Sequence, residues 1–172
     1  MTDPIPTPAK TRTTTLALLH ALPAFLLRAL MLWTFAGTSA AILVLAIDLD
    51  PQASLSALFG HQPELDVGDG ETIYGAIRYD ESRRHISEIV RETYTPGLHC
   101  VPGNLELMEF EHTTPKALAD RPDGTSMFFS RIGESLADIE SAYDIVIIDC
   151  PPQLGFLTLS ALCAATAVLI TV

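Results

Sequence analysis

The stretch of sequence that decides the fold is residues 143–152, which read Tyr-Asp-Ile-Val-Ile-Ile-Asp-Cys-Pro-Pro. Its run of β-branched apolar residues predicts a strand buried on both faces, and the two prolines end that strand just after Asp149. A second apolar run, residues 41–47, leads in the same way into Asp48 and Asp50. Because ligands of an open parallel sheet bind outside the carboxyl ends of its strands, these carboxylates predict a site for magnesium and phosphate.

Strands and helices alternate along the chain, which is typical of right-handed crossovers between parallel strands. We therefore expect an α/β fold with a mostly parallel sheet and helices on both faces. The expected strands cover residues 41–47, 98–101, 145–148 and 167–172. The expected helices cover residues 55–59, 72–79, 84–93, 128–139 and 157–162, another begins at residue 105, and residues 112–125 look like a loop. Because the last expected strand has no helix behind it, we expect the domain to be incomplete.

The chain divides into three segments by composition. Residues 1–15 contain three prolines and a threonine run, and we expect a disordered leader. Residues 16–40 are rich in Leu, Ala and Met and predict an atypical apolar helical segment, which Pro23 breaks or kinks. Residues 41–172 carry the carboxylate motifs and predict a partial nucleotide-binding domain.

The bulk composition excludes several functional classes. Of the 172 residues, 48% are hydrophobic and 18% charged, which is typical of a globular protein. The net charge of -11 argues against nucleic-acid binding by this segment alone. The cysteines Cys100, Cys150 and Cys163 are odd in number and lack metal-ligand spacing, and the five histidines form no ligand pattern. These features predict a reduced, cytoplasmic protein without a His/Cys metal site.

A strand-end aspartate often has a purely structural role, because Asp caps turns and helices. One such residue would therefore carry little weight. Two apolar strands that each end in an aspartate-proline motif are a more specific pattern, and they favour the ligand site over simple capping.

Two motifs carry a resemblance to a known family. Residues 46–54, Ala-Ile-Asp-Leu-Asp-Pro-Gln-Ala-Ser, resemble the second signature of ParA-type partition ATPases, which are P-loop NTPases with deviant Walker motifs. Residues 146–155, Val-Ile-Ile-Asp-Cys-Pro-Pro-Gln-Leu-Gly, resemble their Walker B segment, and residues 101–104 match the family's style of strand exit. From about residue 44 to residue 172 the chain is most similar to RepA proteins of replicon-maintenance operons.

The resemblance implies a role for each matching residue. Asp50 would position the attacking water, Asp48 would support that water or the magnesium shell, and Asp149 would hold Mg²⁺ through water. Pro151 and Pro152, with Gly155, would shape the turn that senses nucleotide and the facing subunit. The implied cofactors are ATP and Mg²⁺. The implied partners are a second copy or a homologue in a dimer, a ParB-type centromere-binding protein and nonspecific DNA, in the service of plasmid segregation.

The chain departs from this family upstream of Asp48. The family's phosphate loop is rich in glycine and ends in Lys-Thr, whereas the first glycine here is Gly37 and Lys10-Thr11 lies in a glycine-free segment. Residues 1–9 are polar and proline-rich, so we also expect no strand before such a loop. A truncated or degenerate copy of the family, without appreciable ATP hydrolysis, is the resulting expectation.

Three alternatives stay open. The first is a noncatalytic subunit that pairs with an intact partition ATPase. The second is a membrane-associated fragment, because residues 16–33 are strongly apolar, although His20, Pro23 and Arg28 interrupt them. The third is another member of the superfamily, such as a division-site regulator or a nitrogenase-iron-protein relative, but the cysteines do not form a cluster pair.

Some side chains also have ordinary structural interpretations. The charged stretches at residues 80–84 and 106–111 are expected to be solvated. Four large apolar side chains are expected in the core, namely Met108, Phe110, Phe128 and Phe129.

Overall fold

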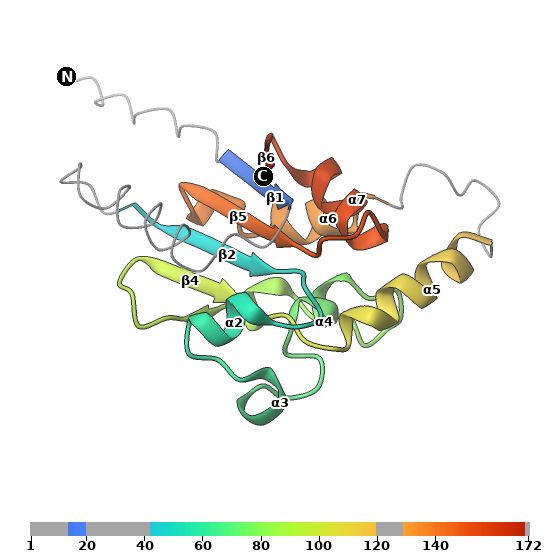
Figure 1. Ribbon diagram of the computed structural model, residues 1–172, viewed down its shortest axis with the longest axis horizontal. Coiled ribbons are helices and arrows are strands. Elements are labelled where there is room, and N and C mark those ends of the chain that lie inside the picture. Colours follow the sequence, from blue (N-terminus) through green and yellow to red (C-terminus); the bar gives the residue numbers. More distant parts are fainter. Residues whose placement is uncertain (1–13, 20–41, 120–128, 171–172) are drawn as a thin grey trace, which may run out of the picture.

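One six-stranded sheet organises the molecule. The computed structural model describes residues 14–19, 42–119 and 129–170. The strand order is β3-β4-β2-β5-β1-β6 (Figure 1). The strands are β1 (Thr14–Leu19), β2 (Val44–Asp48), β3 (Arg91–Glu92), β4 (Leu98–Val101), β5 (Ile145–Cys150) and β6 (Ala167–Ile170). Only β3 pairs antiparallel among these described strands, so the expected mostly parallel sheet is confirmed.

β1 contradicts the expected structure of the N-terminal segment. Residues 14–15 were assigned to the disordered leader and residues 16–19 to the apolar helix, yet all six form a strand between β5 and β6. The physical reason is tertiary: pairing with parallel neighbours on both sides satisfies the backbone and outweighs the preference of Leu and Ala for helix, which is only a fraction of a kcal/mol per residue. The expectation that no strand lies in residues 1–9 falls outside the described residues. The rest of the expected leader and helical segment, residues 1–13 and 20–40, lies outside the described residues.

Helices cover both faces of the sheet, as expected. They are α2 (Ser54–Leu58), α3 (Pro63–Asp66), α4 (Ile73–Ile77), α5 (Leu107–Ala119), α6 (Arg131–Ala137) and α7 (Phe156–Ala164). On one face, Leu55 of α2 packs with Val44 and Ala46 of β2. On the other face, the alternate residues Leu45 and Ile47 join the larger core, which also contains side chains of α4, α5, α6 and α7. The alternation along β2 thus supplies two cores from one strand.

Two expected elements are wrong in part. Residues 84–93 form a 3₁₀ turn at Ile86–Glu88 followed by β3, and not a helix. Helix α5 continues through Pro115 to Ala119, where a loop was expected, and residues 120–128 lie outside the description. Thr113 and Thr114 bond back to the carbonyls of Glu109 and Phe110, which satisfies their hydroxyls inside a helix.

The expected core assignments are also divided. Phe110 is fully buried, whereas Met108 on the opposite side of α5 is 52% exposed and was wrongly placed in the core. Phe129 is half-buried, and Phe128 falls outside the described residues.

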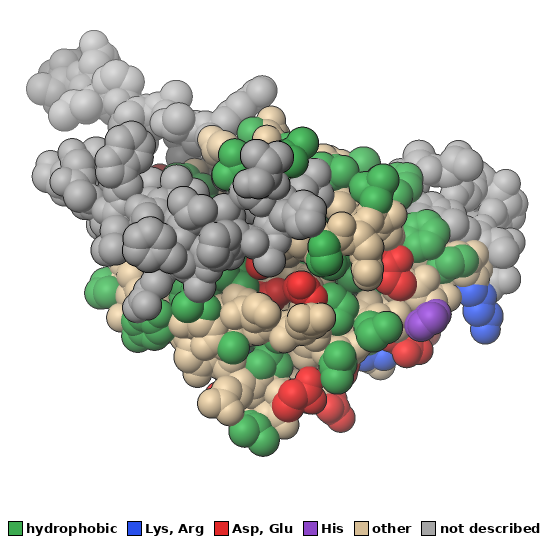
Figure 2. All heavy atoms as spheres, viewed as in Figure 1, with side chains coloured by type: hydrophobic (Ala, Val, Ile, Leu, Met, Phe, Trp, Pro, Cys, Tyr) green, Lys and Arg blue, Asp and Glu red, His purple; other side chains and the backbone are tan. Residues whose placement is uncertain are grey.

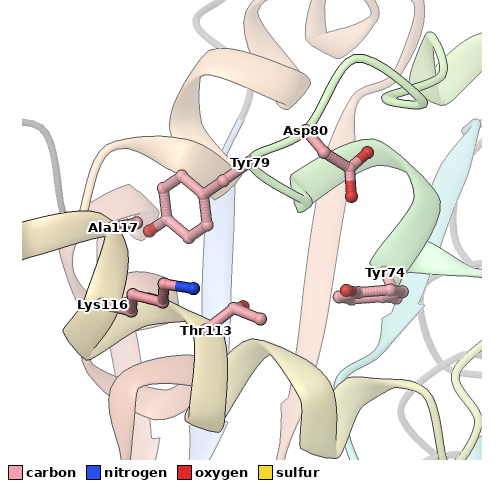
Figure 3. Close-up of a pocket in the computed structure, with 6 residues that line it drawn as sticks. All are labelled: Tyr74, Tyr79, Asp80, Thr113, Lys116 and Ala117. Atoms are coloured by element: carbon pink, nitrogen blue, oxygen red, sulfur yellow. The ribbon is translucent and has the colours of Figure 1, made fainter. Parts of the chain in front are cut away.

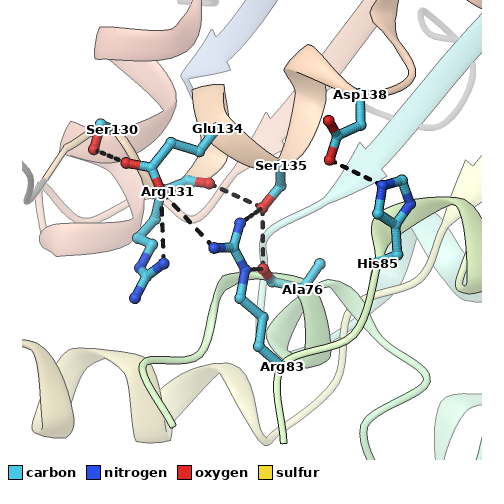
Figure 4. Close-up of polar contacts among 8 residues, drawn as sticks. All are labelled: Ala76, Arg83, His85, Ser130, Arg131, Glu134, Ser135 and Asp138. Atoms are coloured by element: carbon cyan, nitrogen blue, oxygen red, sulfur yellow. Dashed lines mark hydrogen bonds and ion pairs between the residues drawn. The ribbon is translucent and has the colours of Figure 1, made fainter. Parts of the chain in front are cut away.

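A polar network fixes α6 against the segment that follows α4 (Figure 4). Arg83 donates from Nε to the carbonyl of Ala76 at 2.8 Å and from Nη2 to Ser135 Oγ at 3.1 Å. Ser135 Oγ donates to the same carbonyl at 3.0 Å. His85 Nε2 lies 2.9 Å from Asp138 Oδ2. Arg83 therefore has a structural role, although its stretch was expected to be a solvated face.

Only a small part of the segment behind the membrane alternative is described. No helix of the described residues is both long enough and apolar enough to span a bilayer. The apolar residues 16–19 belong to β1, and residues 20–33 are not described.

Candidate functional site

The strand register brings the sequence-predicted carboxylates to one edge of the sheet. Asp48 and Asp149 are paired in the parallel register of β2 and β5. The N–H of Leu49 donates to the carbonyl of Asp149 at 2.9 Å, which joins the two strand exits. Asp50 follows two residues after the end of β2. In Figure 1 the carboxyl ends of β2 and β4 point toward the side where α5 lies.

Asp48 is fully committed to hydrogen bonds within the protein. Its Oδ2 accepts from the N–H of Ser56 at 2.8 Å and from Ser56 Oγ at 2.7 Å. Its Oδ1 accepts from the N–H of Asp50 at 3.1 Å. The side chain is completely buried, and burial raises the pKa of Asp48 to about 6 in spite of these donors. The carboxylate thus holds both the start of α2 and the backbone of Asp50.

A glycine in the exit of β4 completes this network. The N–H of Gly103 donates to Ser56 Oγ at 3.0 Å. A Cβ at this position would lie 2.5 Å from the carbonyl oxygen of Asp48, so the two strand exits approach each other as only glycine allows.

Asp149 has the opposite environment. It is 8% exposed, and its Oδ1 is buried with no hydrogen-bond partner among the described residues. Burial raises the pKa of Asp149 to about 7, and the charges of Asp48 and Asp50 raise it further in the same direction. A buried carboxylate oxygen without a donor, in a negative field, is a place where a cation would be stabilised.

The donor set fits Mg²⁺ held mainly by water and phosphate. No three His, Cys, Asp or Glu side chains of the described residues gather into a metal-binding group. The described residues at this edge therefore do not form a metal site made entirely of protein ligands. Mg²⁺ commonly binds proteins through one or two carboxylates and keeps several waters, and the free Oδ1 of Asp149 suits that mode.

The cysteines near this edge are inert by their environment. Burial raises the pKa of Cys150 to about 12, with a further contribution from the charge of Asp149. Burial also raises the pKa of Cys100, which lies near Asp48. Neither thiol is a ready nucleophile or ligand, in keeping with the interpretation of Cys150 as a small buried residue.

A cavity of about 710 Å³ opens at the segments that follow β2 and β5, and neither Asp48 nor Asp149 is among its lining residues. Asp50 lines it, together with the diproline turn of Pro151 and Pro152. In Figure 2, which shows one face of the molecule, acidic side chains lie near the middle of that face. The remaining lining residues come from the turn after β2, from α5 and its approach, and from the turn after β5: Pro51, Gln52, Ser54, Leu105, Met108, Glu111, His112, Gln153, Leu154 and Gly155. The volume is in the range of small-molecule sites.

Sequence reasoning missed three residues of this site. Ser56 and Gly103 connect Asp48 to two other segments. Glu111 was included in a stretch expected to be solvated, but its carboxylate accepts from the N–H groups of Phe156 and Leu157. A serine shortly after an Asp-x-Asp turn was a weak signal for the first contact, whereas Gly103 and Glu111 depend on tertiary approach alone.

A second, smaller pocket lies between α4 and α5 (Figure 3). Its volume is about 320 Å³, and it is lined by Tyr74, Tyr79, Asp80, Thr113, Lys116 and Ala117. None of the residues predicted from the two motifs lines it.

Comparison with known proteins follows the same motifs. A family described as "AAA domain" (AAA_31) matches residues 34–172. A protein named "Putative replication protein A" from Rhizobium rhizogenes is 66% identical over 129 residues, which is 75% of this chain and 32% of the relative. The chromosome-partitioning ATPase Soj of Treponema pallidum is 32% identical over 126 residues, 73% of this chain and 43% of that protein. The chain thus spans about a third of the length of the first of these relatives.

Solved structures agree on the fold. The cobyrinic acid a,c-diamide synthase of Mycobacterium smegmatis with bound ADP and magnesium matches with a TM-score of 0.69 and 30% identity, over 93% of this chain and 60% of that one. A plasmid partition protein from Borrelia burgdorferi matches with a TM-score of 0.67 and 21% identity, over 93% of this chain and 65% of that one. At that identity the second match supports the fold alone.

Proposed function

Since the chain belongs to the ParA family of AAA domains, we propose that its carboxylate edge is the Mg²⁺–ATP site of a plasmid-partition ATPase-like protein of the RepA kind. The observation that carries the proposal is the buried Oδ1 of Asp149, which has no donor among the described residues and which is followed in the chain by Pro151 and Pro152 of the cavity wall. A magnesium ion bound there would neutralise phosphate charge, which is the main demand of phosphoryl transfer.

The contacts of each aspartate suggest a different role for it in the proposed site. Asp149 would hold the metal ion through water, because one of its oxygens is free of protein donors in the described chain. Asp50 would orient the attacking water from the wall of the cavity. Asp48 would support that water or the metal shell indirectly. Both of its oxygens accept hydrogen bonds from the protein, and one of these bonds fixes the backbone of Asp50.

The diproline turn would bound the nucleotide on the side of β5. Pro151 is buried and Pro152 is exposed, and both line the cavity. Their fixed φ angles make the turn stiff, which suits a segment that must sense a bound group and a facing subunit.

The wider role follows the family by analogy. We place the protein in the cytoplasm, where it would segregate plasmid DNA as a dimer with itself or a homologue, aided by a ParB-type partner. Nonspecific DNA binding would have to come from outside the present acidic chain, whose net charge is -11.

A second candidate is a noncatalytic subunit that pairs with an intact homologue. The sequence upstream of Asp48 favours this candidate, because no glycine precedes Gly37 and a glycine-rich phosphate loop is therefore not recognisable there. The rim of the cavity favours it as well, because three of its apolar side chains are strongly exposed: Leu105 at 58%, Met108 at 52% and Leu154 at 72%.

The test is calorimetric titration of the chain with a non-hydrolysable ATP analogue, with and without Mg²⁺. We expect Mg²⁺-dependent binding that Asp149→Asn abolishes. Asp69→Asn, which makes the same charge change at an exposed position, should leave binding unchanged. The absence of Mg²⁺-dependent binding at millimolar analogue would contradict the proposed site.

Hydrolysis and co-purification together separate the two candidates. A phosphate loop supplies several charge-assisted hydrogen bonds worth about 1.5–3 kcal/mol each, so its loss should weaken affinity by several powers of ten. We therefore expect no appreciable ATP turnover. Turnover that disappears in Asp50→Ala would show instead that the chain is a working ATPase. Co-purification with a full-length homologue, without turnover, would favour the noncatalytic subunit.

A further inference from the structure

Glu111 of α5 holds the beginning of α7. Its Oε2 accepts from the N–H of Phe156 at 2.9 Å, and its Oε1 accepts from the N–H of Leu157 at 2.9 Å. These are the first two residues of α7, whose early N–H groups have no partner within the helix. A carboxylate at this end is also favoured by the helix dipole. The contact therefore joins two helices through a pair of charge-assisted hydrogen bonds.

The neighbouring glycine shows that this approach is close. A Cβ on Gly155 would lie 2.5 Å from Oε1 of Glu111, so any larger residue would displace the carboxylate. Thr158 Oγ1 donates to the carbonyl of Gln153 at 2.7 Å, which holds the preceding turn against the same helix. The start of α7 is thus tied to α5 on one side and to the turn on the other.

The same turn leads directly back to Asp149. Residues 150–155 connect Asp149 to α7, and Pro151 and Pro152 limit their freedom. Glu111, Pro151 and Gly155 all line the cavity beside Asp50. Because the segment is short and stiff, a displacement of Asp149 would be passed on to the start of α7. Glu111 is the residue through which that displacement would reach α5.

We propose that Glu111 is a positioning residue: it fixes the turn after Asp149 to α5, so that a metal ion bound at Asp149 alters α5 as well as the turn. The first part stands on the hydrogen bonds alone, and the second part rests on the proposed function. Gln cannot replace Glu here, because each carboxylate oxygen accepts one N–H and an amide offers only one acceptor oxygen.

Amide hydrogen exchange of the full chain, followed by NMR, tests the first part. In Glu111→Gln the amides of Phe156 and Leu157 should exchange about tenfold faster or more, since a hydrogen bond to a charged group is lost. Glu109→Gln makes the same charge change at an exposed position of α5 and should leave both rates unchanged. Equal rates in wild type and Glu111→Gln would overturn the proposal.

Gly155→Ala approaches the same contact from the other side. It should accelerate exchange at the same two amides, and adding Glu111→Ala should accelerate it little further, because both changes remove one contact. Independent, additive effects would show that Glu111 does not act through this contact.

Titration with MgCl₂ alone tests the second part. In the wild-type chain we expect shifts of the amides of Gln153, Leu154 and Gly155 and also of Glu111 and His112. In Glu111→Gln only the turn should respond, and an undiminished response of α5 would overturn the coupling. If Mg²⁺ shifts no amide of the wild-type chain, the proposed metal site is wrong and the coupling is wrong with it, while the exchange rates still decide whether Glu111 fixes the turn.

Discussion

The strands β2 and β5 both carry an aspartate at their carboxyl ends, and the two aspartates have different roles. Asp48 is the last residue of β2 and Asp149 is the second-last residue of β5, and the two aspartates are neighbours in the register. Asp48 accepts three hydrogen bonds from its own turn and from α2, whereas Asp149 keeps a buried oxygen with no donor among the described residues. The difference teaches that a strand-end carboxylate is assigned to structure or to ligand by the donors that reach it.

The largest effect should come from removing each carboxylate in turn. Asp48→Ala strands the buried N–H and hydroxyl of Ser56, and we expect the free energy of unfolding to fall by about 4 kcal/mol. Asp149→Ala removes a carboxylate whose buried Oδ1 has no donor in the described part of the chain, and it should be neutral or stabilising. Urea denaturation monitored by circular dichroism gives both values. Equal losses for the two variants would break the comparison.

The pH dependence of stability should sharpen the comparison of Asp48 with Asp149. Both folded-state pKa values are raised from 3.8, Asp48 to about 6 and Asp149 to about 7, so the folded chain binds protons more tightly than the unfolded chain. Stability should therefore be greatest near pH 4 and decline up to about pH 7. We expect a loss of about 2–3 kcal/mol, less than the full shifts imply because relaxation and water reduce the cost of burial.

The variant Asp149→Asn separates the two contributions to that decline. It should remove the whole decline between about pH 6 and pH 7 and part of the slope between about pH 4 and pH 6, and it should leave the part that belongs to Asp48. Denaturation curves at half-unit steps of pH would show this. The lowered pKa values of Glu71 and Asp80 act below this window and leave it unaffected. An unchanged decline in Asp149→Asn would mean that this carboxyl ionises as freely as in water.

Magnesium should stabilise only through the turn after β5. At ten times its dissociation constant, an ion that binds the folded chain at one site adds about 1.4 kcal/mol to the free energy of unfolding. We expect this gain above pH 7 in the wild type and its absence in Asp149→Asn. Thermal unfolding with MgCl₂, against a matched concentration of NaCl to control for ionic strength, measures it. A gain that survives in Asp149→Asn would place the ion elsewhere.

The smallest effect concerns the backbone of the turn after β2. Ala53, at the entry to α2, has φ 54°, in the left-handed region that costs a side chain energy. Ala53→Gly should relieve this strain and raise the free energy of unfolding by roughly 0.5–1 kcal/mol after the entropy cost of glycine. Denaturant midpoints would detect it. A destabilised Ala53→Gly would show that the methyl group contributes more through its burial than it costs in strain.

Local patterns predicted the two strand ends and the alternation of strands and helices. Apolar runs followed by Asp and Pro are legible in a few residues, so β2, β5 and the edge with Asp48, Asp50 and Asp149 could be expected. The family match and the sheet topology confirm the α/β class. The roles given to these residues remain predictions.

The remainder depended on contacts that no local pattern records. β1 is a strand because β5 and β6 flank it, and its own Leu and Ala residues favour helix. Helix α5 passes Thr113, Thr114 and Pro115, three residues that usually suggest a loop, and the hydroxyls of both threonines are satisfied by carbonyls of the preceding turn. The contact of Glu111 with α7 spans 45 residues and has no signature in sequence.

The position of β1 has a consequence for how the chain reaches its fold. The backbone of Thr15 hydrogen-bonds to Thr166, a separation of 151 residues. At a translation rate of about 5–20 residues per second, this strand waits roughly ten to thirty seconds for the segments on either side of it. Until then β1 lacks both of its neighbouring strands, and a chaperone or another chain's strand could pair with it first. Synthesis of this protein is thus a period of exposure for β1 that ends only when β5 and β6 enclose it.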